Sequence, residues 1–326
     1  METKVLGIVL TYNEINLTKN AIRSLADSGV DVALVFNGWH EKYNKHLRKL
    51  EKYIDYKFLN YKNIGFCRGN NLAINYAIKK GYDYVFLLNN DAWIDEECLP
   101  ELLKVAEKKE DVGMLQPKVY KAWNNEILDT TGLVFKYGNK YSWERGLGYI
   151  VDRGQNEHDI GKYDNRKQIL GCCACAALYK IRMLKEIGLF WEKLWSMGED
   201  VELSWRAYTY GWRALYVPSA IAYHWRGYST YNLEKENKNL LKKLWSTIGY
   251  RNWTLILEKF GSFNQKIFCF NMWMYYGTKS WVGRRIGKNN IGGKIIWICA
   301  LALLNKQAKS LMENIFNDLF DRCGIK

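Results

Sequence analysis

The first ninety residues alternate between short apolar runs and longer amphipathic stretches. The apolar runs predict buried strands at 5–11, 32–36 and 84–88, with a weaker strand at 56–60. Two stretches between these strands, 16–28 and 70–80, have apolar residues at helical spacing and predict helices. Gly29 directly follows the first stretch and Gly81 the second, as expected at helix C-termini. Strands that alternate with helices predict an α/β fold with a mostly parallel sheet and helices on both faces.

The pattern changes twice further along the chain. Residues 112–171 are mixed, with several glycines and aromatic residues, and we interpret them as a variable insertion over the site. Helical spacing returns at 181–187 and 201–210. After Gly227 the sequence predicts long, basic, aromatic helices and no further clear strand. We therefore expect a catalytic domain at 1–230 and a helical C-terminal region at 231–326.

Polar residues follow the predicted strands. Ligands of parallel α/β sheets bind beyond the carboxyl ends of the strands, which directs attention to 11–13, to Asn37 and to 89–91. A carboxylate such as Asp91 can hold a divalent cation that bridges a diphosphate, although an Asn/Asp-rich turn is also ordinary loop chemistry. Glu199 and Asp200 open a predicted helix, where acids commonly only stabilise the helix dipole.

Five segments, taken in their order along the chain, favour a functional role for these residues over ordinary loop or capping roles. They are VLGIVLTYNE (5–14), NIGFCRGNNLAINYA (63–77), DYVFLLNNDAWID (83–95), LKEIGLFWEKLWSMGEDVELSWRAYTYGWRALYVP (184–218) and AYHWRGYST (222–230). Together they resemble the family 2 glycosyltransferases, most closely their rhamnosyltransferase-like branch. The resemblance covers the first 230 residues and implies a GT-A fold that binds a nucleotide-sugar donor, with Mg²⁺ or Mn²⁺ as cofactor.

The resemblance also implies roles for individual residues. The acid taken as catalytic base is matched by Asp200, with Glu199 beside it, and the retained metal carboxylate is Asp91. His224 matches a histidine that approaches the metal or the donor phosphates, and a purely structural role is about equally expected. The positions implied for donor binding are Thr11, Tyr12, Asn13, Asn37, Asn63, Gly65, Arg68, Asn71, Asn89 and Asn90.

Two departures from the family pattern affect the donor site. The family usually has an Asp at the end of the second strand, where this chain has Phe36, so a preference for uracil does not follow. Arg68 stands where a small residue is common. It could reach a donor phosphate, but a solvated loop charge is the slightly favoured interpretation.

The charge is concentrated in the C-terminal region. Between Lys235 and Lys309 there are 14 Lys and Arg against 2 acids, a surplus of 12 out of the net +14. The run at 295–304 is apolar but only about half as long as a membrane-spanning helix. Aromatic residues, including Trp273, Tyr275, Tyr276 and Trp281, favour an interfacial position. We expect peripheral attachment to an anionic membrane surface, with ordinary core helices as the alternative, and no nucleic-acid partner.

The eight cysteines have neither a secretion signal nor paired zinc-type spacing around them, so we expect reduced thiols, with Cys172, Cys173 and Cys175 on a buried strand. The combined prediction is an inverting, metal-dependent glycosyltransferase at the cytoplasmic membrane face, acting on a glycan or lipid-linked acceptor. A nucleotidyltransferase of the same fold and a catalytically inactive glycan-binding protein are the alternatives. The oligomeric state has no signature in the sequence.

Overall fold

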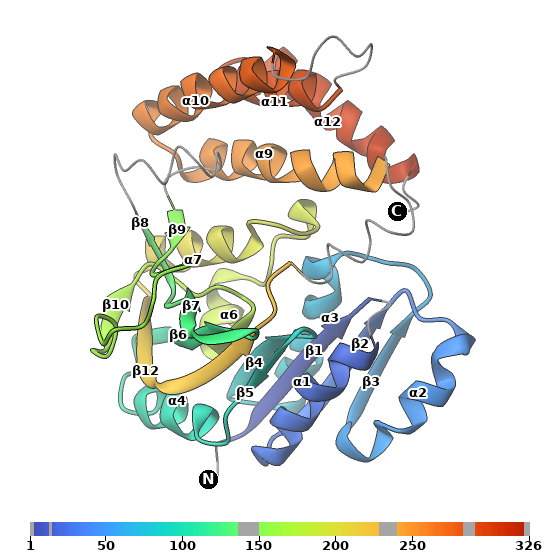
Figure 1. The fold of residues 1–326 in the computed structure, drawn as a ribbon, viewed down its shortest axis with the longest axis vertical. Helices are drawn as coiled ribbons and strands as arrows, with labels where there is room; N and C mark the ends of the chain where they lie inside the picture. The colour runs from blue at the N-terminus through green and yellow to red at the C-terminus, as the bar shows by residue number, and fades with distance from the viewer. Residues whose placement is uncertain (1–2, 13–14, 136–149, 228–239, 283–290, 323–326) are drawn as a thin grey trace. The chain divides into compact units, whose positions relative to one another are not determined.

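The fold is described from a computed structural model, which describes residues 3–12, 15–135, 150–227, 240–282 and 291–322 (Figure 1). The chain forms two compact units. The first takes in residues up to 134, 152–195 and 199–229, and the second is built from residue 230 onward together with 135–151 and 196–198. Each unit is described below by itself.

Ten strands in the described part of the first unit form one sheet, in the order β10-β12-β6-β11-β4-β1-β2-β3, with β5 beside β12 and β7 beside β6. Their bounds are β1 (Val5–Thr11), β2 (Asp31–Asn37), β3 (Tyr56–Asn60), β4 (Tyr84–Asn89), β5 (Ala92–Ile94), β6 (Val112–Lys121), β7 (Asn124–Thr130), β10 (Lys167–Ile169), β11 (Ala176–Lys180) and β12 (Arg213–His224). A separate two-stranded ribbon joins β8 (Leu133–Phe135) and β9 (Ile150–Asp152).

The four strands predicted in the first ninety residues are confirmed and pair in parallel, with β1 between β2 and β4 and with β3 at the edge. Their carboxyl ends therefore meet at one edge of the sheet. Helices cover both faces. A Cβ on Gly7 would meet Leu25 of α1 (Ile15–Asp27), and a Cβ on Gly69 of α3 (Phe66–Lys80) would meet Leu10. Residues 7 and 10 point to opposite faces of a strand, so α1 and α3 lie on opposite faces of the sheet.

The interpretation of 112–171 as an insertion over the site is wrong for its first part. Strand β6 lies inside the sheet, antiparallel to β11 and parallel to β12. Two buried polar residues obscured its pattern in the sequence. Gln116 donates to the Ala176 carbonyl and accepts from the Cys173 N–H, and Lys118 contacts Asp159 and Asp164 at 2.7 and 2.6 Å. Because each of these groups has a partner, the strand can bury them.

The remaining helices of the first unit frame the sheet. They are the short α2 (Asn44–Arg48), then α4 (Cys98–Ala106), α6 (Ile181–Ile187) and α7 (Glu199–Thr209), with 3₁₀ turns at Glu41–Tyr43, Glu51–Tyr53 and Glu192–Leu194. Helix α3 begins four residues before its predicted start. Gly65 is its N-cap residue, with φ of 87°, a conformation that glycine adopts without strain. Cys172, Cys173 and Cys175 are buried free thiols, as expected, but they precede β11 rather than lie on it.

The second unit contains α9 (Leu240–Phe260), α10 (Phe263–Val282), α11 (Ile291–Ala302) and α12 (Lys306–Arg322). These helices enclose an apolar interior that includes Ile256, Trp273, Cys299 and Phe316. Trp273 is fully buried, so the expectation that it faces a membrane interface is wrong, whereas Tyr275 is exposed. The side chains of Tyr276 and Trp281 lie outside the described residues. Among the helices described, none has the length and apolarity needed to cross a bilayer.

Candidate functional site

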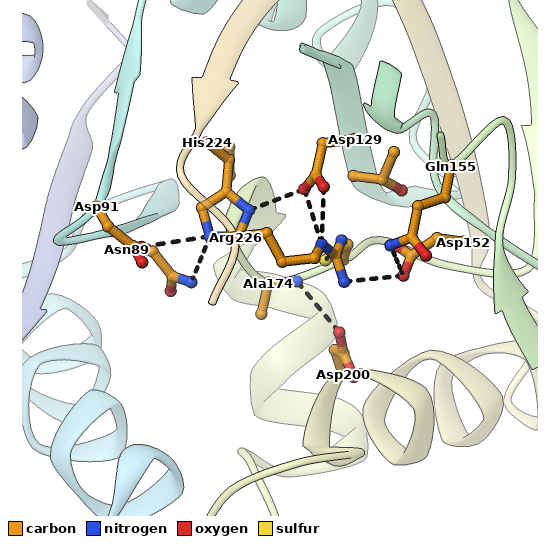
Figure 2. Close-up of polar contacts among 12 residues, drawn as sticks. Asn89, Asp91, Asp129, Asp152, Gln155, Ala174, Asp200, His224 and Arg226 are labelled. Carbon is orange, nitrogen blue, oxygen red and sulfur yellow. Dashed lines mark hydrogen bonds and ion pairs between the residues drawn. The ribbon is translucent and has the colours of Figure 1, made fainter. Parts of the chain in front are cut away.

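The candidate site forms where strands β4 and β12 end. Strand β5 runs antiparallel to β12 and pairs Ala92 with His224, which places His224 beside Asp91 at the end of β4. The Trp225 N–H donates to the Asp91 carbonyl, which holds the two segments together. As a result, His224 Nε2 lies 3.2 Å from Asp91 Oδ1 and 3.5 Å from Asn89 Nδ2 (Figure 2). The structure thus brings together Asn89, Asp91 and His224, which the sequence singled out from two distant segments.

His224 is held from its other side by Asp129 of β7. Nδ1 of His224 lies 2.8 Å from Asp129 Oδ2, and both side chains are buried. Burial lowers the pKa of His224, but the Cys175 thiolate and the Asp129 and Asp91 carboxylates raise it well above its usual value. The imidazole thus lies between two carboxylates, 3.2 Å from Asp91 and 2.8 Å from Asp129. Imidazole and carboxylate are common ligands of divalent cations, so the pair of Asp91 and His224 fits such a cation.

Two groupings of these side chains could hold a metal ion, and both use His224. Ligand atoms of Asp129, Cys175 and His224 all lie within 4.8 Å of one another. The other grouping is Asp91 with His224. In this second grouping Asp91 lies on the Nε2 side of the imidazole, while Nδ1 faces Asp129. A thiolate also suits Zn²⁺ or Cu⁺, whereas oxygen ligands suit Mg²⁺ and Mn²⁺.

Asp129 and Arg226 are residues that the sequence analysis did not identify. Arg226 Nε lies 2.8 and 3.0 Å from the two Asp129 oxygens, and Nη1 lies 3.1 Å from Asp152 Oδ2. Burial alone would raise the pKa of Asp129, but the His224 hydrogen bond and the Arg226 charge lower it to about 2. Arg226 lies within the AYHWRGYST segment, so the family motif is a sequence signal for it. Asp129 carries no sequence signal, because its partner lies 95 positions away.

Asp200 occupies the second position of α7, near this network. Its Oδ1 atom accepts the Val201 N–H at 2.8 Å. Its Oδ2 atom faces the Ala174 N–H at 3.4 Å, as Figure 2 shows. Burial, and then the nearby Asp152 carboxylate, raise the pKa of Asp200 to about 6. At neutral pH the side chain is therefore ionised and more basic than an ordinary aspartate. Glu199, the first residue of α7, is buried.

Helix α7 is anchored by a buried ion pair on its next turn. Arg206 makes two contacts with Glu202, at 3.1 and 2.7 Å. Its remaining N–H groups donate to the carbonyls of Ile187, Gly188 and Leu189 at the C-terminal end of α6. The last carbonyls of a helix have no partner within the helix, so Arg206 can satisfy them and fix α7 against the end of α6.

On the donor side, several predicted residues form the frame of the site. Thr11 is fully buried, and its hydroxyl accepts hydrogen bonds from Thr18 and from Asn90. Tyr12 lies over Gly38, where a Cβ would come within 2.6 Å of the ring. Asn13 lies outside the described residues. Tyr12 is therefore the member of this strand end that is partly exposed.

The Asn37 amide organises the loop before α3. It donates to Asn63 Oδ1 and to the Gly65 carbonyl, and its oxygen accepts the Ile64 N–H. Both donor hydrogens of Asn37 are thereby used, and its side chain is buried. Phe36, in the place of the usual Asp, is also fully buried and packs against Tyr43. In this structure Asn37 holds the 63–65 loop in place rather than presenting its amide to a ligand.

Asn71 and Arg68 of α3 both approach the segment before α7. Asn71 exchanges two hydrogen bonds with the backbone of Phe190, and the buried amide is also 3.3 Å from Glu192. Arg68 is mostly exposed and lies 3.9 Å from Glu192. The structure thus gives Asn71 a framework role, and Arg68 a solvated position consistent with the favoured interpretation.

A groove of about 810 Å³ lies at the amino ends of β1 and β4, opposite the carboxyl ends where the candidate site forms. Its lining includes Lys4, Asp83, Lys180 and Arg182, and it contains none of the candidate site residues. The acids and His224 therefore gather at the edge where ligands of parallel sheets bind, not at this groove.

Comparison with protein families decides what kind of protein has this site. The model of the family described as "Glycosyl transferase family 2" matches residues 8–188, more than half of the chain. The chain belongs to glycosyl transferase family 2. Membership supports glycosyltransferase activity. A search among curated proteins found no match.

Solved structures show that this family 2 protein has the GT-A glycosyltransferase fold. A mannosyltransferase from Pyrobaculum calidifontis, in complex with GDP-Man and Mn²⁺, is 14% identical with a TM-score of 0.51, over 96% of this chain and 74% of that one. S. aureus TarS 1-349 is 13% identical with a TM-score of 0.55, over 99% and 88%. GalNAc-T7 with UDP, GalNAc and Mn²⁺ is 13% identical with a TM-score of 0.57, over 98% and 57%.

Proposed function

We propose that this protein is an inverting, metal-dependent glycosyltransferase that moves a sugar from a nucleotide-sugar donor to a glycan or lipid-linked acceptor. The observation that carries the proposal is the 3.2 Å approach of His224 Nε2 to Asp91 at the carboxyl edge of the sheet, in the same unit as Asp200. Relatives of the fold bind GDP-Man or UDP with Mn²⁺, which supports a donor and a metal of this kind. The five sequence motifs support the rhamnosyltransferase-like branch.

In this proposal Asp91 and His224 hold Mg²⁺ or Mn²⁺. When bound, the cation neutralises the negative charge that develops on the departing diphosphate. Asp200 accepts the proton of the acceptor hydroxyl as that oxygen attacks the anomeric carbon. Its pKa of about 6 leaves it ionised at neutral pH while bringing its basicity closer to what proton transfer needs. A single displacement inverts the anomeric centre.

The framework residues contribute by orientation. Asn37, Asn63 and Gly65 hold the loop at the start of α3, and Asn71 ties α3 to the segment before α7. Among the described donor-side residues, Tyr12 and Asn89 are partly exposed and would contact the nucleotide or its phosphates. Holding donor and acceptor groups in fixed geometry lowers the entropic part of the barrier.

The second unit supports a further part of the proposal, a peripheral position at the cytoplasmic face of an anionic membrane. Trp297, Leu301, Leu304 and Leu311 are exposed apolar side chains. The exposed Lys294 and Lys306 lie within a few positions of them. Apolar side chains flanked by lysines suit the interface of an anionic leaflet, and a lipid-linked acceptor would be found there.

Product analysis tests the proposed reaction. The full chain is incubated with a panel of nucleotide sugars and Mg²⁺ or Mn²⁺, and the released nucleotide is identified by chromatography and mass. Metal-dependent release of a nucleoside diphosphate is expected. Release of pyrophosphate would instead indicate a nucleotidyltransferase. If no sugar nucleotide is consumed and none stabilises the fold against heating, the protein does not have the proposed activity.

A further inference from the structure

Asp129 is a fully buried acid that is hydrogen-bonded to two neighbouring side chains. Its carboxylate faces His224 Nδ1 at 2.8 Å and Arg226 Nε at 2.8 and 3.0 Å (Figure 2). Burying a charge is costly unless the charge is paired and hydrogen-bonded. The protein meets that cost with one cation, Arg226, and with the imidazole that also faces Asp91. A carboxylate kept under these conditions restrains the orientation of His224.

A β-bulge in the sheet orients the Asp129 side chain toward His224. In the pairing of β6 with β7, Val119 faces Thr130 but Tyr120 faces Leu128, so Asp129 is an extra residue between two pairs. Such β-bulges redirect a side chain. Strand β6 also pairs with β12, which ends at His224. The bulge therefore lets a residue two strands away reach the imidazole.

We propose that Asp129 is a positioning residue for the metal ligand His224, accepting the Nδ1 hydrogen so that the Nε2 lone pair faces Asp91. The inference rests on the proposed metal-dependent function and deepens it. An imidazole that binds a metal through one nitrogen commonly donates its other N–H to a carboxylate, which fixes its tautomer and orientation. Asp129 occupies that position here, and Asp91 lies on the Nε2 side.

Arg226 completes the arrangement. It spans from Asp129 to Asp152, and its Nη2 lies 3.7 Å from Cys173 Sγ. Because Arg226 contacts both carboxylate oxygens of Asp129, it keeps the acid from rotating away from His224. This guanidinium thus stabilises the orientation of a residue that itself orients the metal ligand.

A set of conservative variants tests the proposal. Mn²⁺ affinity of the full chain is measured by electron paramagnetic resonance, alone and with GDP or UDP. Asp129→Asn is expected to weaken Mn²⁺ binding about 10- to 100-fold, the usual effect of losing such a partner. Asp164→Asn should leave it unchanged, and Cys175→Ala should weaken it far less than Asp129→Asn does. Cys175 tests the alternative ligand set, and Asp164 is a carboxylate paired with Lys118 elsewhere in the same unit.

Further readouts separate positioning from a general structural role. Binding of GDP or UDP in EDTA, and the melting temperature in EDTA, should change far less in Asp129→Asn than Mn²⁺ affinity does. A second measurement needs only the wild type. With Mg²⁺ and nucleoside diphosphate, the long-range ¹H–¹⁵N spectrum should show His224 protonated at Nδ1, with the signal assigned by its loss in His224→Asn.

The inference is overturned by unchanged Mn²⁺ affinity in Asp129→Asn, by an equal loss in Cys175→Ala, or by an Nε2–H tautomer in the wild type. An equal loss of metal-free nucleotide binding in Asp129→Asn would also reject it, since that indicates a collapsed pocket. If the wild type itself binds neither Mn²⁺ nor nucleoside diphosphate, the proposed function fails together with the inference.

Discussion

Asp200 Oδ2 lies 3.4 Å from the backbone nitrogen of Ala174, so the start of α7 contacts the segment that leads into β11. That segment also carries Cys173, which contacts Arg226, and Cys175, which lies near His224. A short stretch of buried small residues therefore touches both the proposed base and the proposed metal ligand. Small side chains at this position let the two groups approach the same space.

Asp91→Asn is expected to abolish sugar transfer and to remove the metal-dependent part of nucleoside diphosphate binding. The reason is that Asp91 Oδ1 is the oxygen that faces His224 Nε2. Calorimetric titration of GDP and UDP, with and without Mn²⁺, measures the effect. Asp95→Asn, four positions along the same segment, is the matched control. An Mn²⁺-dependent affinity that is the same in Asp91→Asn and in the wild type would rule out the assigned role.

Asp200→Asn should lower the transfer rate by roughly two to four orders of magnitude, the usual contribution of a general base. Donor affinity should survive. The wild-type rate should rise with pH through about 6, because Asp200 works only when ionised and its pKa is raised to about 6. Initial rates at saturating donor, measured between pH 5 and 8, check both points. A wild-type profile that stays flat through pH 6, or a loss confined to donor affinity, would contradict the assignment.

The same raised pKa makes Asp200 a cost to stability at neutral pH. In the unfolded chain its pKa is near 3.8, so the folded state prefers the protonated form. That preference stabilises the fold fully below pH 3.8 and is lost as the pH rises through about 6. Asp200→Asn should therefore exceed the wild type in free energy of unfolding at pH 8 and lose that advantage near pH 4. Urea titrations measure it, and exposed Glu96→Gln should show no such crossover.

Gly65→Ala should destabilise the protein more than Gly81→Ala. Both glycines have positive φ, 87° and 73°, and a methyl group at either position strains the backbone by about 1–3 kcal/mol. At Gly65 the added Cβ would also lie 2.3 Å from Trp195 Cδ1, whereas at Gly81 nothing lies within 4 Å. Urea unfolding of the two variants provides a matched comparison. Equal losses would show that Trp195 moves aside at no cost.

The second unit should bind vesicles that contain phosphatidylglycerol and should release them as salt rises. Each well-placed lysine contributes on the order of 1 kcal/mol at an anionic surface, and salt screens that attraction. Lys294→Glu with Lys306→Glu should weaken co-sedimentation of the full chain, and the exposed Lys108→Glu of the first unit should not. Equal binding to neutral vesicles at high salt, or none at all, would exclude electrostatic attachment.

The sequence predicted best those features that depend on local apolar patterns or on family motifs. The strands at β1 to β4 and the pair formed by Asp91 and His224 followed from apolar runs and from family motifs. Strand β6 did not, because Gln116 and Lys118 break its apolar pattern and are satisfied by partners far along the chain. Trp273 illustrates a different limit. An aromatic residue in a basic helix suits a membrane interface or a core equally well, and packing decided for the core.

The Asn37, Asn63 and Asn71 amides show a limit of predicting donor contacts from the sequence. Polar residues at the edge of a parallel sheet suggest ligand contacts, but the hydrogen bonds of Asn37 and Asn71 are spent on neighbouring backbone. The sequence locates such residues near a site without showing whether their side chains point to the ligand or to the loop behind it. That distinction depends on tertiary contacts, here between residues up to 121 positions apart.

The hydrogen bonds from Arg206 to three carbonyls at the end of α6 affect how a screen of random variants should be interpreted. The helix that begins with Glu199 and Asp200 keeps its place through Glu202 and Arg206, which are both buried. Substitutions there would let the start of the helix drift, and proton transfer tolerates little drift. In a survey that scores only loss of turnover, substitutions of Arg206 would look as severe as substitutions of the proposed base Asp200. Measuring expression level together with turnover would distinguish variants that misplace the helix, such as those at Arg206, from variants that remove the proposed base, Asp200.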